Sequence, residues 1–223
     1  SFISLILSIF HKSLSNMNII IKHLISLIVF ISLTTYLFSP VFFENKEIKQ
    51  HDIEQWKYSA NETIEFRKNN NEEALWSNSM FSGMPAYLID IKWSNYIISN
   101  IHKIYSVFFP HPVSNILISF ISFYIMLLCF RVKPEIALFG SIAFTLSSYL
   151  IVGIAAGHNA RIGTVALLPL IIGGIHLCIT RNRNLGFIIT AVALALQLRL
   201  NHLQITYYTL FILIFYVTNQ FIY

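Results

Sequence analysis

The stretch VSNILISFISFYIMLLCF (113–130) is followed by the basic turn RVK (131–133) and by a second apolar run, EIALFGSIAFTLSSYLIVGIAA (135–156). A helix needs about 20 mostly apolar residues to cross the hydrocarbon core of a bilayer. Each run is close to that length, and only a short polar turn separates them. The stretch therefore predicts two membrane-spanning helices joined as a hairpin.

Apolar runs of similar length lie on both sides of this hairpin. We predict an all-α integral membrane protein with about six transmembrane helices and one long extracytoplasmic loop between the first and the second. The six predicted spans are 24–43, 113–130, 135–156, 162–180, 185–198 and 203–222.

The composition of the whole chain agrees with a location in the membrane. Of its 223 residues, 56% are hydrophobic and 11% are charged, and the mean hydropathy is +0.65. A soluble globular domain carries about 25% charged residues. The composition excludes a soluble enzyme and makes the lipid bilayer the expected partner of this chain.

The net charge of +5 is unevenly distributed along the chain. Segment 44–112 holds seven Lys/Arg and nine Asp/Glu, whereas the rest holds eight Lys/Arg and a single acid, Glu135. Those basic residues lie singly or in pairs between apolar runs, a pattern typical of membrane anchoring and not of a nucleic-acid surface. We therefore expect no nucleic-acid partner.

The chain divides into four parts. Residues 1–16 hold an apolar run too short to span a membrane and are predicted to be an upstream extension, with translation starting at Met17. Residues 17–43 form the first transmembrane helix, a signal anchor. Segment 44–112 is polar and is predicted to be a long extracytoplasmic loop with some fold of its own. Residues 113–223 form a bundle of about five transmembrane helices, which ends inside a hydrophobic stretch and is predicted to be truncated.

The connectors between the spans sort by charge. The turns 131–133 and 181–183 are basic, and Lys22 precedes the first span. If the helices alternate in direction, these residues share one side, which the positive-inside rule makes the cytoplasm. The long loop and the turns at 157–161 and 197–204 then lie outside. This predicts a multi-pass protein of the bacterial inner membrane.

Two acidic residues, Asp52 and Glu54, follow shortly after the first span, in the sequence His51-Asp52-Ile53-Glu54. Two carboxylates at this spacing can supply a general base or bind a divalent cation. An ordinary solvated acidic turn is the alternative. A divalent cation is the one cofactor that these residues suggest, and the sequence leaves the question of a metal open.

An uncharged segment, Trp76-Ser-Asn-Ser-Met-Phe-Ser-Gly-Met-Pro-Ala-Tyr87, lies within the predicted outer loop. Its aromatic, Met, Gly and Pro residues are expected to form a pocket wall, with simple hydrophobic packing as the alternative. The candidate substrate-binding residues in it are Trp76, Asn78, Gly83 and Tyr87.

Two further polar clusters lie in the predicted outer turns. In each turn a histidine and an arginine are three residues apart, so one helical turn would place both on the same side, where they can bind an anionic group such as a phosphate. Polar connectors with no binding role are the alternative. The candidate substrate-binding residues are His158, Asn159 and Arg161 in the first turn, and Arg199, Asn201, His202 and Gln204 in the second.

These clusters occur in the order Gln50-His-Asp52, Trp76-Ser-Asn-Ser-Met-Phe-Ser-Gly-Met-Pro-Ala-Tyr87, Gly157-His-Asn-Ala-Arg161 and Leu196-Gln-Leu-Arg-Leu-Asn-His-Leu-Gln-Ile-Thr-Tyr-Tyr208. In this order they resemble the amino-terminal part of bacterial YfhO-family membrane proteins. The resemblance extends from about Met17 to the end of the chain.

The YfhO family is similar to the GT-C glycosyltransferases, which transfer a sugar from a polyprenyl-phosphate carrier to an acceptor outside the cytoplasmic membrane. The resemblance implies such a donor and a cell-envelope glycan acceptor. It makes Asp52, in the first outer segment, the base or metal partner. Arg161 and Arg199 are then expected to bind the phosphate, and the segment 76–87 to shape the sugar or acceptor pocket.

Two readings from other classes remain open. A lipid or sugar transporter should carry ionisable groups and broken helices near the middle of the bilayer. The predicted spans are almost free of charge, with Glu135 at a helix end. A non-catalytic membrane scaffold is the other alternative.

Overall fold

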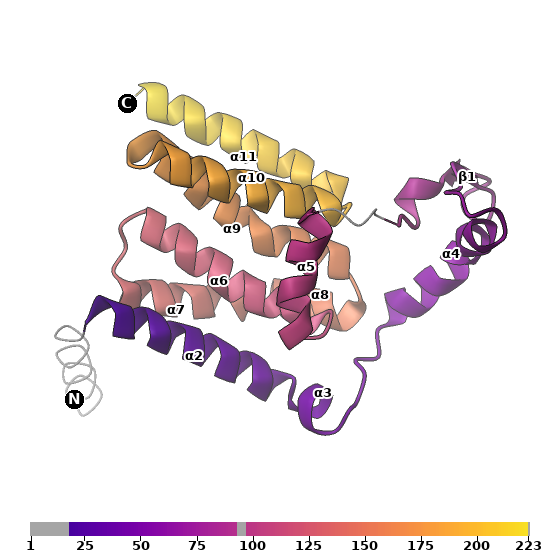
Figure 1. The fold of residues 1–223 in the computed structure, drawn as a ribbon, viewed down its shortest axis with the longest axis horizontal. Coiled ribbons are helices and arrows are strands. Elements are labelled where there is room, and N and C mark those ends of the chain that lie inside the picture. Colours follow the sequence, from indigo (N-terminus) through magenta and orange to yellow (C-terminus); the bar gives the residue numbers. More distant parts are fainter. Residues whose placement is uncertain (1–17, 93–96, 223) are drawn as a thin grey trace.

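The computed structural model describes residues 18–92 and 97–222 (Figure 1). The predicted upstream extension, 1–16, and the predicted start at Met17 lie outside the described residues. The helices of the described part are α2 (Ile19–Leu37), α3 (Ser39–Phe43), α4 (His51–Asn70), the 3-10 helix η1 (Ala86–Leu88), α5 (Ile97–Phe108), α6 (Val113–Cys129), α7 (Pro134–Thr145), α8 (Ser148–Ala156), α9 (Asn159–Thr180), α10 (Arg183–Arg199) and α11 (Leu203–Ile222).

Three helices, α2, α9 and α11, are long and apolar enough to cross a membrane. The pair α7 and α8 passes the same test as a single span, although the chain bends by 43° between them. The predicted mostly helical membrane protein is therefore confirmed at the level of three to four candidate spans. The other two predicted spans correspond to α6 and α10, which have 17 residues each.

The apolar helices pack as a bundle around α6 and α9 (Figure 1). Helix α9 contacts both α6 and α10, and glycines permit these close approaches. A Cβ on Gly173 would lie 2.7 Å from the Cα of Met126, and one on Gly186 would clash with the backbone of Cys178. The core between α2, α6, α7 and α8 contains the buried side chains Phe30, Ile116, Phe120, Tyr124, Ala137, Leu150 and Ile154.

The first predicted span, 24–43, differs from the observed helix at both ends. Helix α2 begins earlier because the side chain of Asn18 caps the backbone N–H of Ile20 at 3.0 Å. It ends at Leu37, and Pro40 lies in the first turn of the separate short helix α3. Proline has no N–H and fits the first turn of a helix, so the chain ends α2 before Pro40 and starts a new helix there.

In the described residues of segment 44–112 no long loop is evident, and regular elements agree with the predicted fold of its own. The segment contains α4, a two-stranded hairpin of β1 (Trp76–Ser77) and β2 (Met84–Pro85), the 3-10 helix η1, and α5. Helix α4 carries two acids in its first turn and two basic residues in its last, which complements the helix dipole. The polar sequence of this segment gave no hydrophobic pattern that predicts a helix, although the charged residues of α4 stabilise the ends of that helix.

Helix α4 leads away from the bundle and carries the hairpin at its far end (Figure 1). The Glu62 carboxylate accepts hydrogen bonds from the Ser77 hydroxyl and from the backbone N–H groups of Asn78 and Ser79. These bonds lower the pKa of Glu62 to about 2, the Ser77 hydroxyl being the largest cause. The hairpin is thus fixed to α4 by a charged hydrogen-bond acceptor.

Candidate functional site

A cleft of about 1030 Å³ lies where the start of α4 meets the turns that precede α9 and α11. Three of the four polar clusters singled out in the sequence contribute to its lining. The predicted site residues among them extend from Asp52 to His202, about 150 positions apart. The predicted site residues that line it are Asp52, His158, Asn159, Arg161, Arg199, Asn201 and His202.

A buried amide pair holds α4 against the bundle. Gln50 and Asn159 exchange two hydrogen bonds through their side-chain amides, each 2.9 Å long, and Gln50 also donates to the Ile154 carbonyl. Asn115 on α6 donates to the Asn159 carbonyl at 3.1 Å. Both members of the pair are only 6% exposed. Since buried amides are costly when unpaired, this contact fixes the position of the first turn of α4.

Gly157 allows α4 to come close to the turn between α8 and α9. Its φ of +101° lies in the left-handed region, which favours glycine. A Cβ at this position would also lie 3.2 Å from the Cβ atoms of both Asp52 and Gln50. The close approach brings the side chain of Asp52 next to that of His158.

Asp52 and His158 form a pair across the cleft. The Nδ1 atom of His158 lies 2.9 Å from the Oδ2 atom of Asp52, and both side chains are about two-fifths exposed. The sequence predicts that His158 binds an anionic group, and the structure instead brings it against the carboxylate. A carboxylate orients an imidazole ring by this contact, and the ring in turn fixes the carboxylate.

Arg161 and Arg199 line the same cleft. Arg161 lies in the first turn of α9, and Arg199 is the last residue of α10. Their Nε atoms are buried and have no hydrogen-bond partner among the described residues. The Arg161 guanidinium lies 5.4 Å from the centre of the Tyr149 ring, a cation–π contact that directs its position. Each arginine thus has a buried guanidinium N–H group that no described residue satisfies.

His202 belongs to this basic side of the cleft. Burial lowers its pKa below the ordinary 6.5, and the nearby charges of Arg161 and His158 lower it further. At neutral pH the imidazole is therefore uncharged and can both donate and accept a hydrogen bond.

The two walls of the cleft differ in charge. We call the wall formed by α4 and residues 88–91 the acidic wall, since Asp52 and Asp90 lie on it, and the wall formed by residues 157–161 and 199–202 the basic wall. An anionic group is favoured at the basic wall, and a hydroxyl group can donate to the exposed part of the Asp52 carboxylate on the acidic wall.

The other predicted site residues lie outside the lining of this cleft. Glu54 faces away from it on α4, beside Lys57 and Tyr58. The backbone carbonyl of Tyr87 accepts a 2.7 Å hydrogen bond from Asn201, and Gln204 donates to Tyr208. Trp76, Asn78 and Gly83 belong to the hairpin at the far end of α4, where the Trp76 ring lies against Gly83.

Sequence reasoning missed Trp56, Asp90 and His111, which also line the cleft. Trp56 was detectable in principle, because it lies four residues after Asp52 and shares a face with it on a helix. Asp90 and His111 carry no such signal, since their place in the cleft depends on how distant segments meet.

The predicted divalent cation stays a prediction. Within residues 18–92 and 97–222, no group of three or more His, Cys, Asp or Glu side chains is arranged to hold a metal ion. Asp52 and His158 offer two ligands at most. Cys129 and Cys178 are both free thiols.

Comparisons with models of known protein families, with curated proteins and with solved structures find no match to this chain. The function is therefore argued from the cleft itself.

Proposed function

We propose that this protein is a membrane-embedded glycosyltransferase of the GT-C type, similar to the YfhO family. It moves a sugar from a polyprenyl-phosphate donor to a cell-envelope glycan acceptor. The observation that carries the proposal is that Asp52, Arg161 and Arg199 line one cleft beside a bundle of apolar helices.

In this mechanism Asp52 acts as the general base. Its carboxylate takes the proton of the acceptor hydroxyl, whose oxygen attacks the anomeric carbon of the donor sugar. The bond between that carbon and the phosphate oxygen breaks, and its electron pair leaves with polyprenyl phosphate. Attack from the side opposite the phosphate inverts the anomeric configuration.

The two arginines of the basic wall stabilise the phosphate group. Their guanidinium donors fit phosphate oxygens, and a partly buried location strengthens the contact. The negative charge grows on the phosphate as the sugar departs, so the arginines favour the transition state more than the bound donor.

The proposed arrangement in the membrane has six spans, formed by α2, α6, the bent pair α7 and α8, α9, α10 and α11. The basic turns face the cytoplasm of a bacterial inner membrane, and the cleft and segment 44–112 lie outside. This topology is supported by the turns that line the cleft, 157–161 and 199–202, which lie at the other ends of α9 and α10 from the turn at 181–183. A polyprenyl chain can then stay in the bilayer while its phosphate reaches the cleft.

The test is sugar transfer in bacterial membranes that contain the protein, with labelled polyprenyl-phosphate sugars as donors. Wild type is compared with Asp52→Asn, and Glu65→Gln is the matched control. Glu65 is an exposed carboxylate on the same helix that is bonded only to Asn61 among the described residues.

Transfer by the wild type and by Glu65→Gln, and its loss in Asp52→Asn at an equal protein level, would support the proposal. Transfer that survives in Asp52→Asn would remove Asp52 from the mechanism. Absence of transfer with every donor in the wild-type membranes would contradict the enzyme proposal.

One observation favours the transporter alternative. The bend between α7 and α8 interrupts a span, and at this bend the buried hydroxyls of Thr145 and Ser119 lie 3.1 Å apart. Broken helices often line substrate paths in transporters. Flipping of a labelled polyprenyl-phosphate sugar across vesicles that contain the protein, without transfer, would select this alternative.

A further inference from the structure

Trp56 is the one cleft aromatic on the same helix as Asp52 within the described residues. The two residues are four apart, so they lie one above the other on one face of α4. Helix α4 leads away from the bundle (Figure 1). Four residues at a rise of 1.5 Å each place Trp56 about 6 Å further along this helix than Asp52.

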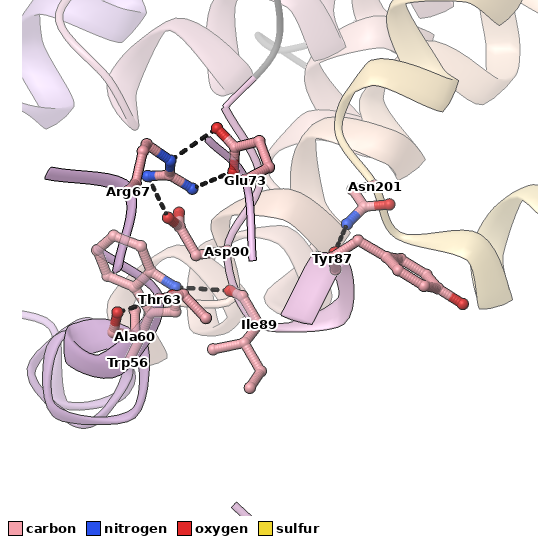
Figure 2. Close-up of polar contacts among 9 residues, drawn as sticks. All are labelled: Trp56, Ala60, Thr63, Arg67, Glu73, Tyr87, Ile89, Asp90 and Asn201. Atoms are coloured by element: carbon pink, nitrogen blue, oxygen red, sulfur yellow. Dashed lines mark hydrogen bonds and ion pairs between the residues drawn. The ribbon is translucent and has the colours of Figure 1, made fainter. Parts of the chain in front are cut away.

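The indole ring is held in a fixed orientation. Its Nε1–H donates a 2.8 Å hydrogen bond to the backbone carbonyl of Ile89, as Figure 2 shows. The segment that carries Ile89 is itself fixed on both sides. Arg67 pairs with Asp90 at 2.8 Å, and Asn201 donates to the Tyr87 carbonyl. With its only polar atom bonded, the ring offers a purely apolar surface to the cleft.

That surface is open to a ligand. The side chain of Trp56 remains 38% exposed although it lines a cleft. The Asp52 carboxylate lies on the same wall, whereas the carboxylate of Asp90 is already paired with Arg67. An apolar ring with an acceptor beside it matches the chemistry of a sugar, which has a face of C–H groups and a rim of hydroxyl donors.

The direction along α4 decides which sugar binds there. In an inverting transfer the acceptor and the phosphate lie on opposite sides of the anomeric carbon. The arginines of the basic wall mark the phosphate side, and Asp52 marks the attacking hydroxyl. Trp56 lies beyond Asp52, further from the bundle, and therefore on the acceptor side.

We propose that Trp56 is the acceptor platform of this site, against whose ring a sugar unit of the acceptor glycan packs while its hydroxyl reaches Asp52. The assignment of this sugar to the acceptor rests on the proposed function. The binding of a glycan to Trp56 does not, and it can be measured without any transfer.

The first experiment measures binding of labelled cellohexaose, chitohexaose and mannohexaose to the purified protein in lipid nanodiscs by fluorescence polarisation. Trp56→Leu removes the aromatic ring, Trp56→Phe keeps a ring but loses the N–H donor, and Tyr58→Leu is the matched control. Tyr58 is an exposed aromatic residue of the same helix that lies outside the cleft.

We expect at least one of the three glycans to bind the wild type, about tenfold weaker binding in Trp56→Leu, and near-normal binding in Trp56→Phe and in Tyr58→Leu. The phenylalanine variant distinguishes the contribution of the ring from that of its hydrogen bond, because it removes the bond to the Ile89 carbonyl and keeps an apolar aromatic face. Equal affinity in wild type and Trp56→Leu, or no binding of any of the three glycans, would overturn the inference.

The second experiment uses the transfer assay and compares KM with kcat. Trp56→Leu should raise the KM for the acceptor about tenfold and leave the KM for the polyprenyl-phosphate donor unchanged. A raised donor KM with an unchanged acceptor KM would contradict the assignment to the acceptor. Glycan binding that depends on Trp56, in a protein that transfers no sugar, would refute the proposed enzyme and leave the glycan site in place.

Discussion

The acidic and basic walls of the cleft are built in different ways. The basic wall consists of two short turns, one at the start of α9 and one at the end of α10, and these two helices pack closely against each other in the bundle. In the most apolar 18-residue window of α9, 56% of the residues are buried. The acidic wall belongs to α4 and its neighbouring segment, which leave the bundle and are held mainly by polar contacts. Apolar packing fixes the basic wall and hydrogen bonds fix the acidic wall. Substitutions should therefore act on the basic wall through lost apolar packing and on the acidic wall through lost hydrogen bonds.

The largest effect is expected at the carboxylate of the acidic wall. Asp52→Asn removes the base and should lower sugar transfer about 10²- to 10⁴-fold. Glu54→Gln, two residues further on, should lower it much less, because Glu54 lies outside the cleft lining. Rates of transfer at matched protein levels measure the difference, and equal losses in both variants would show that the acidic turn acts as a whole.

The next effect concerns the arginines of the basic wall. Arg161→Gln and Arg199→Gln should each weaken binding of a polyprenyl-phosphate sugar about tenfold, since a charge-assisted hydrogen bond contributes about 1.5–3 kcal/mol. Donor titration of the reconstituted protein measures this, with Arg183→Gln as a control, because Arg183 lies at the start of α10, at the end away from the cleft. Unchanged donor affinity in the double variant Arg161→Gln/Arg199→Gln would show that the two arginines do not bind the donor phosphate.

A smaller effect is expected where the two walls join. Gln50→Leu leaves the buried amide of Asn159 without its two reciprocal bonds, which should cost about 1–3 kcal/mol. Spin labels at the exposed positions Lys57 and Leu203 would report the separation of the walls, and a broader distance distribution is expected in the variant. Asn61→Leu, which removes an exposed amide of α4, should leave the distribution as in the wild type. An unaltered distribution in Gln50→Leu would show that other contacts hold α4.

The smallest effect is confined to the far end of α4. The pKa of Glu62 is lowered to about 2 from an ordinary 4.5, so its support for the hairpin is fully present above about pH 4.5 and is lost as the pH falls through about 2. Hydrogen exchange at the backbone amides of Asn78 and Ser79 measures this support. Protection should persist at pH 4 in the wild type, and at pH 4 and above it should be weaker in Glu62→Gln. Protection that does not depend on pH or on Glu62 would contradict the assignment.

The difference between the walls also explains what could be read from the sequence. Arg161 and Arg199 were predictable as a pair because each lies in a polar turn between two apolar runs, and those runs fix where the turns must be. Asp52 was predicted as a site residue, but its pairing with His158 was not, since 106 positions separate the two. Trp56 was not predicted as a site residue because the sequence of α4 was interpreted as part of a loop. Residues four apart share a face only on a helix, so the spacing of Asp52 and Trp56 gave no prediction. The segment 76–87 was predicted to shape the pocket, and the structure puts most of it at the far end of α4.

The sequence by itself determined the helical membrane character of this protein, because the length and apolarity of a run are local properties that a bilayer reads directly. It also determined where the polar turns between those runs fall. Only the tertiary structure decided which polar side chains meet. Their meeting depends on the direction in which α4 leaves the bundle. That direction is set by the amide pair of Gln50 and Asn159 and by the space above Gly157, contacts between residues more than 100 positions apart. Such contacts leave no local pattern in a single sequence, because each of their residues has an ordinary local environment of its own.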